Sequence, residues 1–328
     1  MGQQQHLKKV SGALNSDRLR LSTCWNAHRY QDGRILAMEA CDMGFKWIEI
    51  SHGTPVTLIP GLLLAQQQKI VKVGSLHAPC PAAVEVQGDA PDRYEFTSSR
   101  AEERRRAISL TVATIEMAAR FGVDRIVLHL GRALPPGGTE KLESLALAGG
   151  LFGREYVNQK LELVTARERA SKVALDWVRV ALDELIPHAE KHAVKIGMET
   201  RSHYEQVPSM HEMQVLLAEY ADCPWIGTWH DFGHVQRQAN LGFLDARAFL
   251  ELNVPRLLGC HIHDVGWPHK DHQIPFSSGG VDFASLLPLV PSHVPLIWEM
   301  SPRQKRLQII AAREEWQRRF PDLAAEVA

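Results

Sequence analysis

The sequence predicts an α/β fold of one domain, in which eight parallel strands close into a barrel and a helix or helix-sized segment follows each strand. The 328-residue chain is 45% hydrophobic, which is enough to bury a large core without disulfide bonds. Short apolar runs alternate with longer amphipathic stretches along nearly all of it. Eight such runs occur, and eight parallel strands close a barrel that their own side chains fill, a (β/α)8 or TIM barrel. A doubly wound open sheet is the alternative, although no glycine-rich phosphate turn follows the first strand.

The predicted elements follow one another without a linker. Strands are expected at residues 19–24, 47–50, 73–77, 125–130, 195–199, 225–231, 257–263 and 295–299. Apolar residues at spacings of three and four predict helices most clearly at 100–121 and 167–193, and a further amphipathic stretch at 302–320 follows the last strand. We therefore expect a flexible N-terminal tail over residues 1–18 and one barrel over residues 19–328.

One long segment interrupts this alternation. Residues 131–164, after the fourth strand, contain two adjacent prolines and two glycine pairs and are expected to be an irregular insertion. A loop of that length in a compact domain is usually a lid, a binding loop or a contact with a partner subunit. A tolerated surface insertion is equally compatible with the sequence.

Charge and cysteine content restrict the class of protein. The 37 basic and 38 acidic residues leave a net charge of −1, without the basic excess that duplex DNA binders usually carry. Five widely spaced cysteines without a C-x-x-C pair suit a reducing compartment. The N-terminus has no apolar signal-peptide core, and no apolar run reaches 18 residues. We expect a cytoplasmic protein without nucleic-acid or membrane partners; whether it forms a homo-oligomer is left open.

Histidines and carboxylates gather at the predicted strand ends. Eight of the sixteen histidines lie there, namely His77, His129, His230, His234, His261, His263, His269 and His272. Glu199, Asp231 and Glu299 end three of the predicted strands. In a closed barrel these ends meet at one rim, where so many buried charged groups need a cation to neutralise them. The sequence therefore predicts a metal site, and its oxygen and nitrogen donors suit Mn, Zn, Fe or Co.

Strand alternation orients some of these side chains. His261 and His263 are two residues apart, so both face into the barrel, with His263 nearer the rim. His263 is therefore the better metal ligand and His261 a supporting or core residue. Asp231 faces in, whereas its neighbour His230 faces out and is expected to pack against a helix.

These residues resemble the xylose-isomerase-like barrel superfamily of sugar phosphate isomerases and epimerases, ketose 3-epimerases and apurinic endonucleases. The run Glu199-Thr-Arg-Ser-His-Tyr-Glu205-Gln resembles a ketose 3-epimerase segment in which a metal-binding catalytic Glu precedes a substrate-holding Glu by six residues. Asp231-Phe-Gly-His234 resembles that group's Asp-x-x-His, and His261-Ile-His263 resembles its His-x-His strand. The resemblance covers residues 19 to about 320 of the chain.

The resemblance implies a site built around one divalent metal ion, without a nucleotide cofactor, that takes a small sugar or sugar derivative. The implied metal ligands are Glu199, Asp231, His263 and Glu299, of which Glu199 and Glu299 are also the acid/base pair. The residues expected to face the substrate are Glu205, His234, His269, His77 and His129. His269 stands where the ketose 3-epimerases carry an Arg, which leaves the identity of the substrate open.

The expected reaction is isomerisation or epimerisation through an enediolate. A proton next to a carbonyl is lost at neutral pH only when a cation polarises the carbonyl, and two carboxylates can then remove and return it. The same first step begins eliminations, so a metal-dependent lyase or hydrolase acting on keto-sugars or keto-glycosides is an alternative. A non-catalytic alternative is a barrel that only stores metal or acts as a scaffold for a partner.

An apurinic-endonuclease-like trinuclear zinc phosphodiesterase is the third enzymatic alternative. It would add His77, His129, His234, Asp271 and His272 to the four metal ligands. Asp271 and His272 are adjacent, whereas the nuclease pattern has one residue between them, and the missing basic excess also opposes this interpretation.

Overall fold

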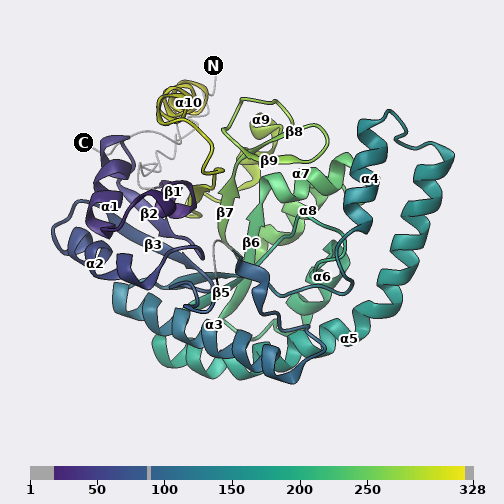
Figure 1. Cartoon of the computed structure of the whole chain (residues 1–328), viewed down its shortest axis with the longest axis horizontal. Helices are drawn as coiled ribbons and strands as arrows, with labels where there is room; N and C mark the ends of the chain where they lie inside the picture. The colour runs from purple at the N-terminus through teal and green to yellow at the C-terminus, as the bar shows by residue number, and fades with distance from the viewer. Residues whose placement is uncertain (1–17, 87–89, 322–328) are drawn as a thin grey trace, which may run out of the picture.

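The computed structural model describes residues 18–86 and 90–321, and eight parallel strands form a closed barrel in the order β1-β10-β7-β6-β5-β4-β3-β2 (Figure 1). The barrel strands are β1 (Leu19–Ser22), β2 (Trp47–Ile50), β3 (Lys72–His77), β4 (Arg125–Leu128), β5 (Lys195–Glu199), β6 (Ile226–Asp231), β7 (Leu257–Ile262) and β10 (Leu296–Trp298). Each lies within a predicted run or starts one residue before it. The closed barrel is confirmed, and the open doubly wound sheet is excluded.

Helices connect the strands and surround the barrel. They are α1 (Gly33–Asp42), α2 (Ile59–Gln67), α3 (Ala101–Phe121), α4 (Gly138–Leu147), α5 (Arg154–His192), α6 (Met210–Glu219), α7 (Phe232–Asn240), α8 (Ala246–Asn253), α9 (Phe283–Leu286) and α10 (Arg306–Arg319). Short 3-10 turns are η2 (Thr23–Trp25), η3 (Ala27–Arg29), η4 (Val56–Leu58), η5 (Pro91–Arg93), η6 (Val254–Arg256) and η7 (Leu287–Leu289). The helix expected at 302–320 begins only at 306, and the residues before it form a loop.

The insertion after β4 is present, but the expectation that residues 131–164 are irregular is wrong. They contain α4 and the beginning of α5, a helix of 39 residues that was expected to start only at 167 (Figure 1). Tyr156 and Leu163 of α5 pack with Leu142 of α4 and with Leu241 in a small core of their own. Gly137 and Gly149 lie at the two ends of α4. Their φ values of 130° and 79° are positive, and glycine adopts such values without steric cost.

The barrel interior is closed beneath the strand ends by Trp229. This side chain of β6 is fully buried and clusters with Val127 and Ile297. A Cβ at Gly259 would lie 2.3 Å from the Trp229 ring, so the glycine on β7 leaves the space that the indole fills. The side chains nearer the carboxyl ends of the strands therefore rest on a packed floor.

A two-stranded antiparallel hairpin that the sequence did not predict follows β7. It consists of β8 (Asp264–Gly266) and β9 (Lys270–Gln273). The buried carboxylate of Asp264 accepts backbone N–H groups of Ser278, Gly279, Gly280 and Val281 at 2.7 to 3.1 Å. This one carboxylate holds the return loop against the base of the hairpin, which fixes the rim on that side.

The expected tail over residues 1–18 falls outside the described residues, except for Arg18. The buried guanidinium of Arg18 donates to the carbonyl oxygens of Val290, Pro291 and Val294, so this residue is part of the barrel wall. All five cysteines are free thiols. Within residues 18–86 and 90–321, none of the helices has the length and apolar character that spanning a membrane requires.

Candidate active site

Three buried carboxylates meet at the rim formed by the carboxyl ends of the strands. Glu199 is the last residue of β5, Asp231 is the last residue of β6, and Glu299 directly follows β10. Oxygen atoms of these side chains and a ring nitrogen of His261 all lie within 4.8 Å of one another. The structure thus brings together three of the four side chains that the sequence predicts as metal ligands.

The imidazole of His261 lies between two carboxylates. Its Nε2 is 3.0 Å from Oε1 of Glu49 and its Nδ1 is 2.9 Å from Oε1 of Glu199, with all three side chains fully buried. Burial would lower the pKa of His261, but Glu299, Glu49 and Glu199 outweigh it and raise that pKa well above its ordinary value. Both ring nitrogens of His261 face carboxylates, so His261 supports the carboxylate group from within.

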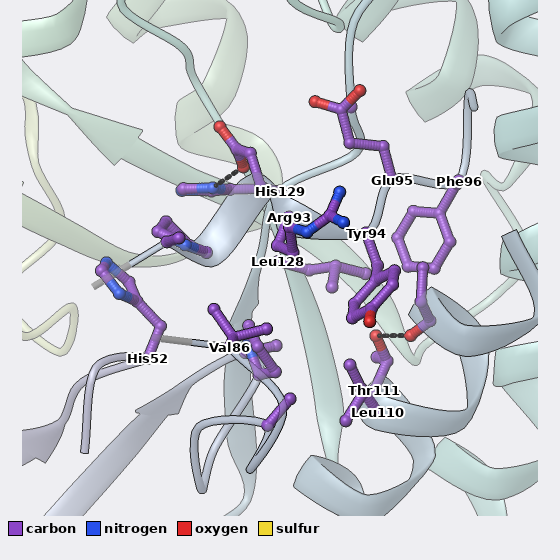
Figure 2. A pocket seen from close by; sticks show the side chains of 18 of the residues that line it. His52, Val86, Arg93, Tyr94, Glu95, Phe96, Leu110, Thr111, Leu128 and His129 are labelled. Carbon is purple, nitrogen blue, oxygen red and sulfur yellow. Dashed lines mark hydrogen bonds and ion pairs between the residues drawn. The ribbon is translucent and has the colours of Figure 1, made fainter. Parts of the chain in front are cut away.

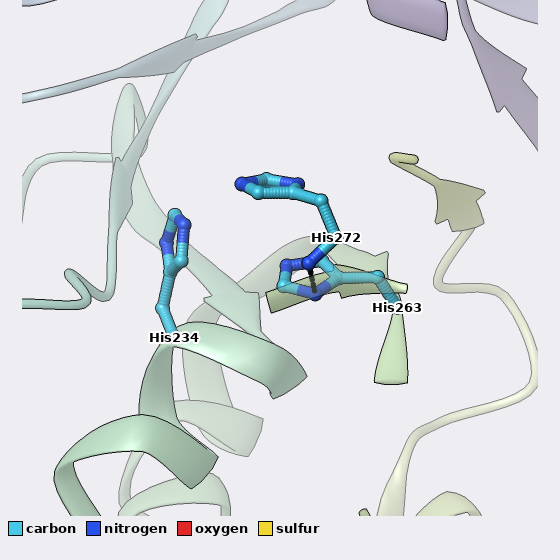
Figure 3. A group of neighbouring side chains, drawn as sticks. All are labelled: His234, His263 and His272. Carbon is cyan, nitrogen blue, oxygen red and sulfur yellow. Dashed lines mark hydrogen bonds between the residues drawn. The ribbon is translucent and has the colours of Figure 1, made fainter. Parts of the chain in front are cut away.

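His263 lies next to the carboxylate group. Its Nε2 is 3.0 Å and 3.1 Å from the two carboxylate oxygens of Asp231. His263 also forms a second group with His234 and His272, whose ring nitrogens lie within 4.8 Å of one another (Figure 3). The backbone N–H of His272 donates to Nδ1 of His263 at 2.8 Å. His263 therefore connects the three carboxylates, through Asp231, with the other two imidazoles.

Backbone carbonyls orient these other two rings. Nδ1 of His234 lies 3.2 Å from the carbonyl oxygen of Thr200, and Nδ1 of His272 lies 3.2 Å from that of Glu299. Because a carbonyl oxygen only accepts, each Nδ1 carries a hydrogen. Burial lowers the pKa of His234 to about 4 against the opposing effect of Asp231, so its ring is neutral at pH 7. Nε2 of His234 therefore keeps a lone pair that can accept a hydrogen bond from a hydroxyl group or bind a metal.

The two oxygens of Glu199 have different surroundings. His129 and His77 place their Nε2 atoms 2.6 Å and 3.2 Å from Oε2, and a guanidinium nitrogen of Arg201 lies 3.6 Å from it. Oε1 is the oxygen that contacts His261. Burial would raise the pKa of Glu199, but His129 and His261 outweigh it and hold that pKa well below its ordinary value. Glu199 is therefore a carboxylate anion that is held from two sides.

The donor set fits a divalent cation. Carboxylate oxygens and imidazole nitrogens, with no thiol among them, are typical ligands of Mn, Fe, Co and Zn. Glu49, Glu199, Asp231 and Glu299 are all buried, and His261 lies between Glu49 and Glu199. A divalent cation would balance the remaining negative charge, which is costly to bury alone.

A cavity of about 640 Å³ gives a ligand access to Glu299. Its wall includes His269, Asp271 and His272 from the segment around β9, and the loop that joins β10 to α10. The volume lies within the usual range for small-molecule sites. Of the residues expected to face a substrate, His269 is the one that lines this cavity directly.

An apolar cavity between β3 and α3 is too small to be the substrate site. It is lined by His52 and His129 at one edge and by apolar side chains such as Val86 and Leu110 (Figure 2). It holds about 30 Å³, which is room for about one water molecule.

The family model described as "xylose isomerase-like TIM barrel" matches residues 38–319. The chain belongs to this family. A search of curated proteins finds no match to this chain.

Solved structures share this xylose isomerase-like barrel at low sequence identity. A 3-keto-D-glucoside 4-epimerase, YcjR, from E. coli is 15% identical, with 92% of this chain and 98% of that chain covered and a TM-score of 0.65. A D-allulose 3-epimerase from Methylomonas sp. in complex with D-allulose is 15% identical, with 92% and 96% covered and a TM-score of 0.64. The IolI protein "with a binding zinc atom" is 13% identical, with 95% and 99% covered and a TM-score of 0.63. At these identities the likeness establishes the fold.

Two residues predicted for the site of this xylose isomerase-like barrel are linked to the insertion. Glu205 contacts it directly, and Asp271 is linked to it through Arg237. The buried carboxylate of Glu205 accepts the backbone N–H of Thr139 at 2.9 Å and the Thr139 hydroxyl, which caps the first turn of α4. Asp271 pairs at 2.6 Å with Arg237, whose guanidinium also donates to Glu143 of α4 at 2.7 Å. Both carboxylates therefore have a structural partner in the protein itself.

Four further side chains lie in this region without having been predicted, namely Asp92, Arg201, Arg237 and Thr139. Arg201 lies two residues after Glu199, so its position beside a strand end was the signal that could have identified it. The other three come from a 3-10 turn and two helices, where the local pattern gives no such signal. His230 packs outward against Phe249 of α8, as strand alternation predicts.

Proposed function

We propose that this chain is a divalent-metal-dependent sugar isomerase or epimerase that moves a proton next to a carbonyl group. The observation that carries the proposal is the buried group of Glu199, Asp231 and Glu299, with Glu299 open to a cavity of about 640 Å³. Family membership supports it, as do structures of similar fold that are described as a D-allulose 3-epimerase with D-allulose and as a zinc-holding protein.

In this proposal Glu199, Asp231, His263 and Glu299 hold the metal. His263 is preferred to His261 because both ring nitrogens of His261 already contact carboxylates. Nε2 of His263 contacts Asp231, so His263 lies beside the carboxylate group, with Asp231 between them. A bound divalent ion supplies charge that polarises the substrate carbonyl and stabilises the anion left when the neighbouring proton is removed.

The chain's own residues then handle the proton. Glu199 comes from β5 and Glu299 follows β10, so the two carboxylates approach a bound sugar from different sides of the barrel rim. One takes the proton from carbon and the other returns a proton, which gives epimerisation or isomerisation. His234 offers the lone pair of Nε2 to a substrate hydroxyl, and His269 contacts the distal part of the substrate from the cavity wall.

Solvent-proton exchange tests this proposal. The metal-loaded protein is incubated in D2O with a panel of ketoses and keto-glycosides, and deuterium at the carbon next to the carbonyl is followed by NMR. We expect exchange with the unmodified protein and its loss in Glu199→Gln and in Glu299→Gln. Glu251→Gln is the control, because Glu251 forms an exposed pair with Arg247 on α8. Exchange that survives in both active-site variants would contradict the two-carboxylate mechanism.

Product and metal analysis separate this function from the two alternatives. An isomerase or epimerase returns a sugar of unchanged composition, whereas a lyase or hydrolase releases a fragment. Elemental analysis of the purified protein should give about one metal per chain, because one buried carboxylate group provides one four-ligand site. About three metals per chain, together with cleavage of abasic DNA, would instead support the nuclease.

A further inference from the structure

Asp92, on the turn η5 between β3 and α3, contacts two of the three groups that approach one oxygen of Glu199, namely His129 and Arg201 but not His77. Its Oδ1 lies 2.6 Å from Nδ1 of His129, a contact drawn as a dashed line in Figure 2. Its Oδ2 accepts from a guanidinium nitrogen of Arg201 at 2.8 Å. Burial would raise the pKa of Asp92, but Arg201 and His129 outweigh it and hold that pKa well below its ordinary value. Asp92 is therefore an anion that anchors two side chains at once.

Both anchored side chains end on the same atom. Nε2 of His129 lies 2.6 Å and the second guanidinium nitrogen of Arg201 lies 3.6 Å from Oε2 of Glu199. Oε1 of Glu199 lies on the opposite side, 2.9 Å from His261 and 3.7 Å from His234. Asp92, His129, Arg201 and Glu199 thus form a closed ring of contacts that reaches only one of the two carboxylate oxygens.

A ring of this kind restricts a rotation that is otherwise soft. The terminal torsion of a Glu side chain is broad, so a carboxylate without fixed partners exchanges its two oxygens readily. The ion-pair contacts at Oε2 restrict that rotation and leave Oε1 toward His261. Partners that orient a metal-binding or catalytic group from outside typically change metal affinity or activity about 10- to 100-fold when they are removed.

We propose that Asp92 is a positioning residue that, through His129 and Arg201, keeps Oε1 of Glu199 facing the reacting centre. The inference rests on the proposed function for its catalytic part, because Glu199 is the acid/base of that reaction. Its cation-binding part needs only that Glu199 contributes to a metal site.

Glu95 supplies a matched control on the same loop. Its carboxylate pairs with Arg132 at 2.6 Å and feels the charge of Arg201 only at longer range, without an ion pair. The side chains of Asp92 and Glu95 are 22% and 14% exposed, so removal of either one deletes a mostly buried carboxylate with an arginine partner. A general loss of loop structure would affect both variants alike, whereas positioning of Glu199 would be lost only with Asp92.

The experiment compares Asp92→Ala and Asp92→Asn with Glu95→Ala and Glu95→Gln in two measurements. The first is kcat and KM of solvent-proton exchange on the best ketose. The second is titration with Co²⁺ alone, followed by its visible absorption. Asp92→Ala should lower kcat about 10- to 100-fold with KM changed less than about twofold, weaken Co²⁺ binding about tenfold and alter the Co²⁺ spectrum. Asp92→Asn keeps an oxygen that can accept from His129 and should lose less.

The control variants should match the unmodified protein in both measurements. A Glu95→Ala defect equal to that of Asp92→Ala, or an Asp92→Ala variant with unchanged kcat and Co²⁺ spectrum, would overturn the inference. If Asp92→Ala does not fold, the comparison of Asp92→Asn with Glu95→Gln decides the question in the same way. If the unmodified protein exchanges no proton of any keto-sugar, the proposed function fails, and the Co²⁺ titration still tests whether Asp92 positions Glu199.

Discussion

Nε2 of His261 lies 3.0 Å from Oε1 of Glu49, and both side chains are completely enclosed by the barrel. The pair lies beside Glu199 and Asp231, so it is the inner support of the carboxylate group at the rim. A buried pair of this kind costs desolvation to form, and without Glu49 the nearest carboxylate that remains on His261 is Glu199, at 2.9 Å.

Glu49→Ala removes one of the two close carboxylate partners of His261 and leaves a cavity, so it should destabilise the metal-free protein by about 2 to 5 kcal/mol. Urea denaturation in the presence of a chelator measures this change. Ser75→Ala is the matched comparison, because it removes only the 2.8 Å hydrogen bond from Ser75 to Glu49 and should cost about 1 kcal/mol. Equal effects of the two substitutions would show that the charge on Glu49 is unimportant.

Arg237 links Glu143 of the insertion to Asp271 in the wall of the cavity beside Glu299. Arg237→Met should leave both carboxylates without this shared partner. Both contacts are short, at 2.7 Å and 2.6 Å, and Arg237 is 7% exposed. We expect a loss of about 3 to 5 kcal/mol of unfolding free energy. In the double variant Arg237→Met/Glu143→Met part of this loss should return. A double variant as destabilised as the sum of both single variants would argue against a coupled pair.

Substitutions at Glu205 and Thr139 distinguish two roles of Glu205, one in substrate binding and one in holding the insertion. Its carboxylate accepts both the backbone N–H and the hydroxyl of Thr139 at the start of α4. Thr139→Val removes the hydroxyl contact and should lower stability by about 1 kcal/mol without raising KM. Glu205→Gln should do the same if Glu205 only caps α4. A rise of KM confined to Glu205→Gln, measured by the exchange assay, would support the substrate contact that the sequence predicts.

The strands were the most predictable part of the fold. Buried apolar runs of the right length end at Glu199 and Asp231, and the rule that barrel strands end at one rim brings those two carboxylates together. Strand alternation also placed His230 outside and His261 inside correctly. These features depend on local periodicity, which a single sequence contains.

The insertion and the surroundings of Glu199 were not predictable in this way. Tyr156 makes α5 continue toward its N-terminus because it packs on Leu142 and donates to the carbonyl of Leu241, 85 residues later. Asp92 reaches His129 from a 3-10 turn 37 residues earlier. Both contacts join segments whose relative position exists only after the chain has folded, so no local pattern announces them.

His230 should make stability depend on pH in acid. Burial lowers its pKa to about 4, although Asp231 acts in the opposite direction, while the unfolded chain keeps an ordinary value near 6.5. Between these values the unfolded state binds more protons, so the free energy of unfolding falls as the pH is lowered from about 6.5 to about 4. His230 contributes up to about 3 kcal/mol to that fall.

His230→Asn keeps an acceptor for Asn253, which lies 3.0 Å from Nδ1 of His230, and cannot take up a proton. Urea denaturation of the metal-free proteins at several pH values measures the free energy of unfolding. Between pH 6.5 and 4 this free energy should fall less steeply in the variant, because the two proteins share every other titrating group. Parallel declines would contradict a neutral, buried His230.

Strand β10 completes the barrel by pairing with β1 on one side and β7 on the other, with Leu296 opposite Leu19 and Cys260. Every other barrel strand precedes it in the chain, and Glu299 follows it directly. During synthesis, β1 and β7 therefore remain as unpaired edges until β10 emerges, and unpaired edges are sites of aggregation. Because the last carboxylate arrives with the strand that removes those edges, a chain that is still folding has neither a closed barrel nor the complete carboxylate group at its rim.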